Sequence, residues 1–185
     1  GGHKIFGENK VQEFVRKYEE LPKDIEWPFI GHLQTNKVKL IIPFVQLIHG
    51  VDSFKLLKVI DSEAKKHNRQ VKSLLQFYIA EEETKFGLTL TEAEEILRSP
   101  DFKLLKNICI AGVMGMATYT ENLSQIRTEF KLLKTIFKTL KNEYFSGLKN
   151  FTEISMGMSD DYQIAIEEGS TLIRVGSKIF GERNY

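Results

Sequence analysis

The sequence of 185 residues contains one cysteine and no apolar run long enough to span a bilayer. A single thiol, Cys109, cannot form an internal disulfide, so nothing points to secretion. Because its neighbours in "NICIAGVM" are apolar, we expect a buried, unreactive thiol rather than a nucleophile. No signal peptide is visible, and the sequence therefore predicts a cytoplasmic protein without a membrane partner.

The sequence also lacks an excess of charge of either sign. Lys and Arg together number 26 and Asp and Glu 25, which gives a formal net charge of +1. The lysines are spread out, with one adjacent pair at Lys65 and Lys66 and no long basic block. Nucleic acids select basic patches, so we do not expect a nucleic-acid partner.

Several motifs that carry chemistry are missing. No GxGxxG or GxxxxGK[ST] follows the first predicted strand, and no GxSxG elbow occurs. His32 and His49 end predicted strands, but they lack the HxH or HxxxH spacing of a metal site. The adjacent carboxylates of Glu81–Glu83 are typical of solvated or capping residues. We therefore predict no metal site and assign no catalytic residue.

What the sequence does contain is a regular alternation of apolar runs with segments of helical period. Seven strands are predicted, at residues 3–7 ("HKIFG"), 27–31, 44–51, 71–80, 108–116, 151–158 and 171–176. Strict alternation of strand and helix predicts a parallel sheet covered by helices.

The helical segments carry boundary signals. Thr91 with Glu94 three residues later fits a capping box at a helix start. The longest helix is predicted in "NLSQIRTEFKLLKTIFKTLKNEYF", and "DDYQIAIEEG" is predicted to end at Gly169.

Two architectures fit this alternation, an open doubly wound sheet and a closed (β/α)8 barrel. A barrel needs eight strands and usually about 250 residues. Because the chain opens on a strand and has seven, we predict an α/β protein with a TIM-type barrel that lacks its first βα unit. Residues 1–185 would form one domain, with strands 2 to 8 of the barrel.

Two predicted strand ends near the C-terminus have the composition of a phosphate site. In "MGMS", Ser159 stands at an expected helix N-cap, and in "RVGS", Gly176 and Ser177 open a short helix. Helix N-termini on the last strands of a barrel bind phosphate. The alternative is purely structural: Ser159 caps its helix, Gly176 makes a turn, and Asp160–Asp161 already complement the helix dipole.

An arginine interrupts the last apolar run. Arg174 lies within "TLIRVG", and a charge in a buried strand needs an anionic or hydrogen-bonding partner. Either it holds a carboxylate as a structural contact, or it faces a bound ligand.

A set of motifs in one order is more specific than any single residue. The chain contains "FGENKVQE", "FIGHLQTNK", "IHGVDS", "EEETKFG", "GVMGM" and "SMGMSDDYQIAIEEGSTLIRVGSKIFGER". Together they closely resemble the pyridoxal phosphate homeostasis protein family, whose fold is like the N-terminal barrel of alanine racemase. The resemblance covers essentially the whole chain. It implies a protein that binds pyridoxal 5′-phosphate (PLP), mostly as a monomer, and buffers or delivers it without clear catalytic turnover.

The resemblance also implies a set of cofactor contacts. Ser159, with Met158 before it, and Gly176 with Ser177 would surround the phosphate, the last two mainly through backbone N–H groups. Arg174 would lie near the pyridine nitrogen and keep it unprotonated, which makes the ring a poorer electron sink.

The resemblance implies two further contacts. Asn9 in "FGEN" and His32 in "GHLQTNK" would line the pocket.

The chain departs from the family at its start. The family's cofactor lysine lies in a segment resembling "AVSKTK" upstream of "FGEN", and no such segment occurs here. Lys4, Lys37 and Lys85 do not occupy that position, so none is assigned the role. A barrel without one strand has two open edges, so we expect either that the missing strand is present in the protein or that the fold is domain-swapped or distorted.

Two alternatives stay open. One is a PLP-dependent racemase or decarboxylase whose lysine lies in the missing segment, with Tyr119 as an acid-base candidate. The other is a structural protein that no longer binds PLP.

Overall fold

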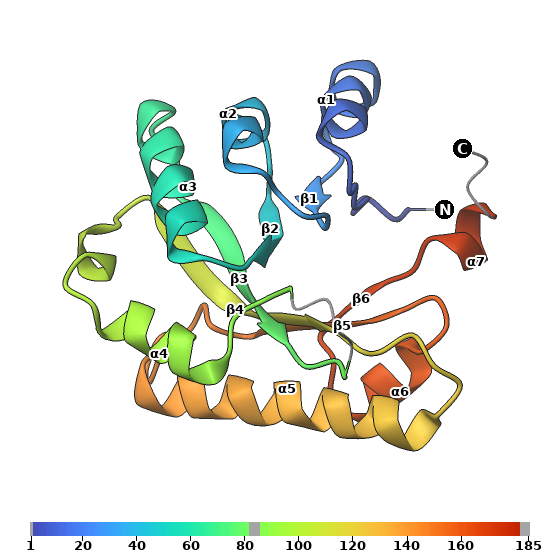
Figure 1. The fold of residues 1–185 in the computed structure, drawn as a ribbon. Helices are drawn as coiled ribbons and strands as arrows, with labels where there is room; N and C mark the ends of the chain where they lie inside the picture. The colour runs from blue at the N-terminus through green and yellow to red at the C-terminus, as the bar shows by residue number, and fades with distance from the viewer. Residues whose placement is uncertain (1, 82–85, 182–185) are drawn as a thin grey trace.

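The computed structural model describes residues 2–81 and 86–181, which form a curled parallel sheet with helices outside it (Figure 1). The strands are β1 (Pro28–Phe29), β2 (Leu47–Val51), β3 (Val71–Tyr78), β4 (Ile108–Met116), β5 (Glu153–Met158) and β6 (Leu172–Arg174). The α-helices are α1 (Val11–Glu20), α2 (Val38–Ile41), α3 (Phe54–Lys66), α4 (Leu90–Arg98), α5 (Leu123–Glu143), α6 (Tyr162–Glu167) and α7 (Ser177–Phe180). Two short 3₁₀ helices, η1 (Thr35–Lys37) and η2 (Phe102–Leu104), complete the list.

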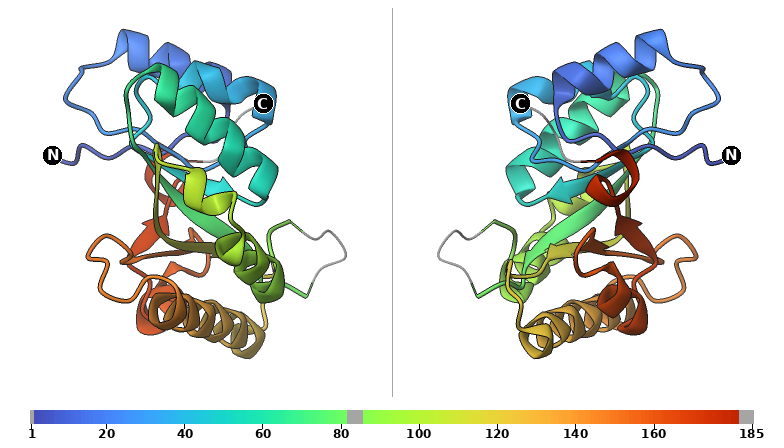
Figure 2. Two further views of the ribbon diagram at one scale, coloured as in Figure 1. Left: turned by 90° about the vertical axis from the view of Figure 1, so that its left-hand side faces the viewer. Right: turned by 90° about the vertical axis from the view of Figure 1, so that its right-hand side faces the viewer.

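The strand order is β1-β2-β3-β4-β5-β6, and every pair is parallel. Because each crossover returns to the next strand with the same hand, the helices cover one face of the sheet. The two side views show α1, α2 and α3 above the strands and α5 and α6 below them, outside the curve (Figure 2). The predicted α/β class with a parallel sheet is therefore confirmed.

The prediction of a strand in "HKIFG" is wrong in its detail. Residues 5–8, which overlap it, make two isolated parallel bridges, Ile5 with Glu26 and Glu8 with Phe29. On the facing segment, the N–H of Glu26 donates to the carbonyl of Lys4, and the N–H of Ile30 donates to the carbonyl of Glu8. Pro28 lies at the donor position between them and has no N–H, so the ladder is interrupted there.

The described residues form an open sheet. One edge is β1 with the bridged segment beside it, and the other edge is β6. The last strand was expected to be buried, but it is only partly so: Ile173 in β6 is 40% exposed.

The main apolar core lies between the outer face of the sheet and the helices. α5 is the longest helix, as predicted, and its N-cap Asn122 accepts a hydrogen bond from the backbone of Gln125. Phe130, Leu133 and Leu140 on its inner face are fully buried, each stabilising the fold by roughly 1.5–3 kcal/mol. Of the helices in the described residues, none has the length and apolar character needed to cross a membrane.

The start of α4 differs from the sequence prediction. The capping box uses Thr89 and Glu92 rather than Thr91 and Glu94: Thr89 Oγ1 accepts from the Glu92 N–H at 3.2 Å, and the Glu92 carboxylate accepts from the Thr89 N–H at 2.8 Å. Both pairs fit the motif. The earlier start adds Leu90 to the helix, where it packs against the core.

β4 contains a bulge at the centre of the sheet. Ser73 of β3 pairs with Ile110 and Leu74 pairs with Gly112, which leaves Ala111 unmatched. Gly112 has φ +155°, and a Cβ there would lie 1.9 Å from the carbonyl oxygen of Glu153 in β5. Only glycine lets the two backbones approach so closely.

Replacing Gly112 with alanine should therefore destabilise the fold by at least about 2 kcal/mol, because the added methyl group collides with rigid backbone. The midpoint of urea unfolding measures this loss. Gly147→Ala is the matched control: φ is +78°, but nothing lies within 4 Å of an added Cβ, so only the strain of about 1 kcal/mol is expected. Equal losses in the two variants would contradict the proposed collision.

Candidate functional site

The concave face of the sheet has an apolar floor below the C-terminal ends of the strands. It consists of Leu74, Ala111 and Met114, with Leu47 and Leu172 packed beside them. Polar side chains lie on the same face and are also buried: His49 on β2, Gln76 on β3 and Ser155 on β5. A polar group in such a place must find a hydrogen-bonding partner inside the protein.

His49 and Ser155 form a hydrogen bond across the curve of the sheet. His49 Nδ1 lies 2.8 Å from Ser155 Oγ, and the two residues are 4% and 0% exposed. Their strands, β2 and β5, are separated by β3 and β4. In a flat sheet the strand axes would be about 14 Å apart, so this bond can form only because the sheet is curled.

Arg174 joins the same network from β6. Its Nη1 donates to Ser155 Oγ at 2.5 Å, and its Nη2 donates to the carbonyl oxygen of Gly115 in β4 at 3.1 Å. Because the Ser155 oxygen accepts from Arg174, its hydroxyl hydrogen can be donated to His49 Nδ1; in that arrangement the hydrogen of the neutral imidazole lies on Nε2.

The two ionisable groups of the network affect each other's pKa. Burial, and after it the positive charge of Arg174, together lower the pKa of His49 to about 3. Burial also lowers the pKa of Arg174 to about 10, which still leaves it charged, while the carboxylate of Asp161 opposes that change. His49 is therefore neutral and Arg174 is charged at neutral pH.

The sequence left two roles open for Arg174. The contacts exclude a structural ion pair within the described residues, since no carboxylate there lies within salt-bridge distance of its guanidinium. Its observed partners are a hydroxyl and a carbonyl, which do not neutralise its charge.

Ser159 does not cap α6, contrary to the prediction. The N-cap of α6 is Asp161, two residues later, and its carboxylate accepts from the Met158 N–H at 2.6 Å. Ser159 is 8% exposed, and its Oγ accepts from the Gly176 N–H at 3.3 Å. The loops after β5 and β6 are thus joined through this hydroxyl.

Gly176 and Ser177 lie where the sequence placed them, at the N-cap and first residue of α7. Both are exposed, and nothing lies within 4 Å of a Cβ built on Gly176. Met158 pairs with Arg174 in the register of β5 and β6 and is 41% exposed. These residues form an accessible polar rim at one side of the sheet.

Asn9 and His32 lie together at the opposite side of the sheet, beside β1. A Cβ on Gly31 would lie 2.2 Å from the carbonyl oxygen of Asn9, so the two chain segments touch there. His32 is exposed, and its Nδ1 lies 3.5 Å from Asp52 Oδ2.

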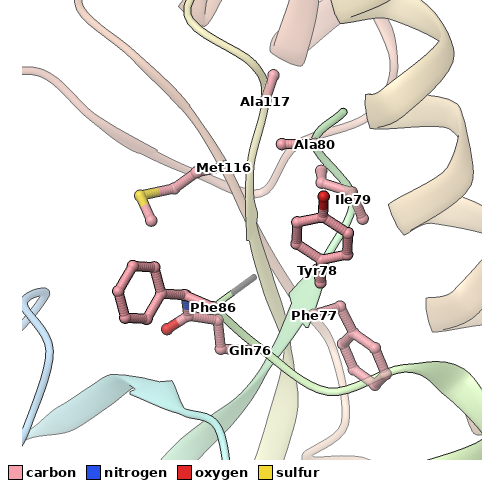
Figure 3. Close-up of a pocket in the computed structure, with 8 residues that line it drawn as sticks. All are labelled: Gln76, Phe77, Tyr78, Ile79, Ala80, Phe86, Met116 and Ala117. Atoms are coloured by element: carbon pink, nitrogen blue, oxygen red, sulfur yellow. The ribbon is translucent and has the colours of Figure 1, made fainter. Parts of the chain in front are cut away.

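A pocket of about 230 Å³ opens at the C-terminal ends of β1, β3 and β4. Its walls are largely apolar, with two polar side chains among them, and its lining residues are Ile30, Gly31, His32, Gln76, Phe86, Met114 and Met116. A smaller pocket of about 70 Å³ continues over the ends of β3 and β4. Figure 3 shows Phe86 beside Gln76 and facing Met116, while Phe77 extends away from them.

Among the described residues that line these pockets there is no lysine. Lys4 donates to Asp24 at 2.6 Å, and Lys37 lies in η1. Tyr119 is 87% exposed and lines neither pocket. Lys85, like Glu82 and Glu83, lies outside the described residues, within which no cluster of His, Cys, Asp and Glu with metal-binding geometry occurs.

Sequence reasoning missed the roles of His49 and Ser155. Both lie beside register shifts, between Ile48 and Val51 in β2 and between Ser155 and Met158 in β5. Bulges often re-aim side chains next to functional sites. The available signal was a glycine within each strand, Gly50 and Gly157.

Comparisons with known proteins agree with this geometry. The family model for the alanine racemase N-terminal domain matches residues 1–184. A pyridoxal phosphate homeostasis protein of Aquifex aeolicus is 42% identical over 186 residues, covering 100% of this chain and 79% of the relative. The Homo sapiens protein of the same name is 36% identical over 194 residues, covering 100% and 70%. The structure of PipY from Synechococcus elongatus with PLP bound has a TM-score of 0.85 and 33% identity, covering 97% of this chain and 82% of that one.

The neutral state of His49 should make stability depend on pH. In the unfolded chain the imidazole binds a proton near pH 6.5, whereas the folded protein holds its pKa at about 3. The free energy of unfolding should therefore fall as the pH drops from 6.5 towards 3, by about 2–3 kcal/mol over the first two pH units.

Urea unfolding at pH 6.5 and 4.5 measures this loss, and His49→Asn should remove most of it. His67→Gln, at the exposed end of α3, controls for loss of an imidazole. If His49→Asn keeps the wild-type dependence on pH, the buried neutral imidazole is refuted.

Proposed function

Because this chain belongs to the pyridoxal phosphate homeostasis protein family, within the alanine racemase N-terminal domain group, we propose that it binds PLP and serves PLP homeostasis without catalysing turnover. The observation that carries the proposal is the convergence of Arg174, Ser159 and Gly176 on the C-terminal edge of one parallel sheet. Ligands of such sheets bind at that edge.

The donors around Ser159 fit a phosphate group. The Gly176 N–H reaches Ser159 Oγ at 3.3 Å, longer than the usual 2.9–3.0 Å, so a phosphate oxygen could take this N–H at little cost. The open space at Gly176 allows an anion to approach the backbone, and the hydroxyl of Ser177 is exposed beside it. We propose that Ser159, Gly176 and Ser177 bind the phosphate, with Met158 alongside.

The neighbouring groups fit an aromatic ring. Arg174 is fixed beside the phosphate residues, and the apolar walls of the pocket begin at Met114 and Met116. We propose that Arg174 faces the pyridine nitrogen and that Asn9 and His32 line the far side. PLP when bound supplies an electron-withdrawing ring, and an arginine at its nitrogen weakens that property, which supports binding without turnover.

We further propose that the open sheet is completed to a (β/α)8 barrel by one more βα unit, placed between the segment at residues 5–8 and β6. Two observations support this: both edges are open, and α7 beside β6 exposes Ile179 and Phe180. The family resemblance implies that this unit carries the cofactor lysine. The monomeric state and the cytoplasmic location stay predictions.

A PLP-dependent racemase or decarboxylase is the second candidate, and the match to the alanine racemase N-terminal domain favours it. Against it, Tyr119 does not line the pockets. Incubating the PLP-loaded protein with L-amino acids and separating enantiomers and amines by chiral chromatography should give no product above the rate of free PLP. Accumulation of D-amino acid or amine would establish the enzyme instead.

Ser159→Ala should weaken PLP binding about 10- to 100-fold, because a hydrogen bond to a charged phosphate is worth about 1.5–3 kcal/mol. Equilibrium dialysis with PLP measures the dissociation constant. Ser62→Ala, on the exposed surface of α3, is the matched control and should leave it unchanged. Wild-type affinity in Ser159→Ala would show that the phosphate lies elsewhere.

A further inference from the structure

We propose that Ser155 and His49 are positioning residues for Arg174, which orient its guanidinium towards the bound ligand without touching the ligand themselves. The inference rests on the proposed function, since it concerns how the PLP site is held in shape.

Arg174 needs such support because of its place in the fold. It lies at the end of a three-residue edge strand, β6, where a long side chain has many rotamers. Its two nitrogens reach acceptors on two different strands, Ser155 Oγ on β5 and the Gly115 carbonyl on β4. Two acceptors on separate strands fix the plane of a guanidinium, as one could not.

The Gly115 carbonyl is a rigid acceptor, whereas the Ser155 hydroxyl is not. A hydroxyl rotates freely and can turn either its hydrogen or a lone pair towards a neighbour. The Ser155 hydroxyl keeps a lone pair directed at Arg174 only if its own hydrogen is donated to another acceptor. His49 Nδ1, 2.8 Å away on the other side, is the acceptor that holds it.

His49 can do this only as a neutral imidazole with a bare Nδ1. Burial and the nearby charge of Arg174 both oppose its protonation, as its low pKa reflects. If Nδ1 carried a proton, it would donate to Ser155 Oγ, and the hydroxyl hydrogen would lose the acceptor that fixes its direction. The order of donors is thus Arg174 to Ser155 to His49.

A purely structural role for His49 would give a different result. An imidazole that only fills space would affect folding stability, and its loss would affect ligand affinity equally whether or not Arg174 is present. A positioning residue acts through Arg174, so its effect on affinity must disappear when Arg174 is removed.

The test is a double-mutant cycle with His49→Leu, Arg174→Gln and the double variant, with PLP affinity measured by equilibrium dialysis and stability by thermal melting. His49→Leu should weaken PLP binding about three- to tenfold in the wild-type background and less than twofold in the Arg174→Gln background. His49→Asn, whose side-chain oxygen can replace Nδ1 as acceptor, should recover most of the affinity. Equal fold-losses in both backgrounds, or full affinity in a folded His49→Leu protein, would overturn the inference.

Nitrogen-15 NMR of the ligand-free protein provides a test that needs neither a His49 variant nor PLP. The His49 ring should show a bare Nδ1 and a protonated Nε2, and Ser155→Ala should broaden or shift the Arg174 side-chain signals. A proton on Nδ1, or Arg174 signals unchanged by Ser155→Ala, would refute the positioning role. Failure of the wild-type chain to bind PLP would refute the proposed function instead. The NMR result would still decide whether Ser155 and His49 hold Arg174 in place.

Discussion

The hydrogen bond between His49 and Ser155 is the contact on which the site depends. It joins β2 to β5 across the concave face, over two intervening strands, and therefore requires the sheet to be curled. The same curvature lets Arg174 on β6 reach back to the carbonyl of Gly115 on β4. A flat sheet of the same strands would separate His49 from Ser155 and leave the buried imidazole without this partner, at a cost of about 1–3 kcal/mol.

The loops at the mouth of the site are also held by the protein itself. Glu129 of α5 is buried, and its carboxylate accepts hydrogen bonds from the backbone and hydroxyl of Thr118 after β4 and from the backbone of Glu81 after β3. One side chain thus ties two neighbouring strand ends to the longest helix. These hydrogen bonds fix the loops within the protein itself, and loops fixed in this way reduce the ordering cost of binding.

Features that depend on residues close in sequence could be predicted, whereas contacts between residues far apart in sequence could not. The parallel sheet was predictable because apolar runs and helical periods are local patterns, and the glycine and serine of "RVGS" lie where the motif placed them. The interruption of the ladder at Pro28 could be explained from the sequence only once the segment at residues 5–8 was known to lie beside it. The pairing of His49 with Ser155 was not, since 106 positions separate them and only the curl of the sheet brings them together. Ser159 was expected at the N-cap of α6, but Asp161, two residues later, holds that position.

The bulge at Ala111 has a consequence for which side chains the ligand would meet. Before it, the even-numbered residues Ile108 and Ile110 face the helices; after it, Val113 does so, and Met114 and Met116 turn inward. One extra residue shifts the alternation of the strand by half a period. Had β4 kept its original phase, its valine would face the pocket and its two methionines would be buried under the helices. The extra residue in the bulge therefore determines which side chains of β4 line the pocket, as much as the amino-acid types do.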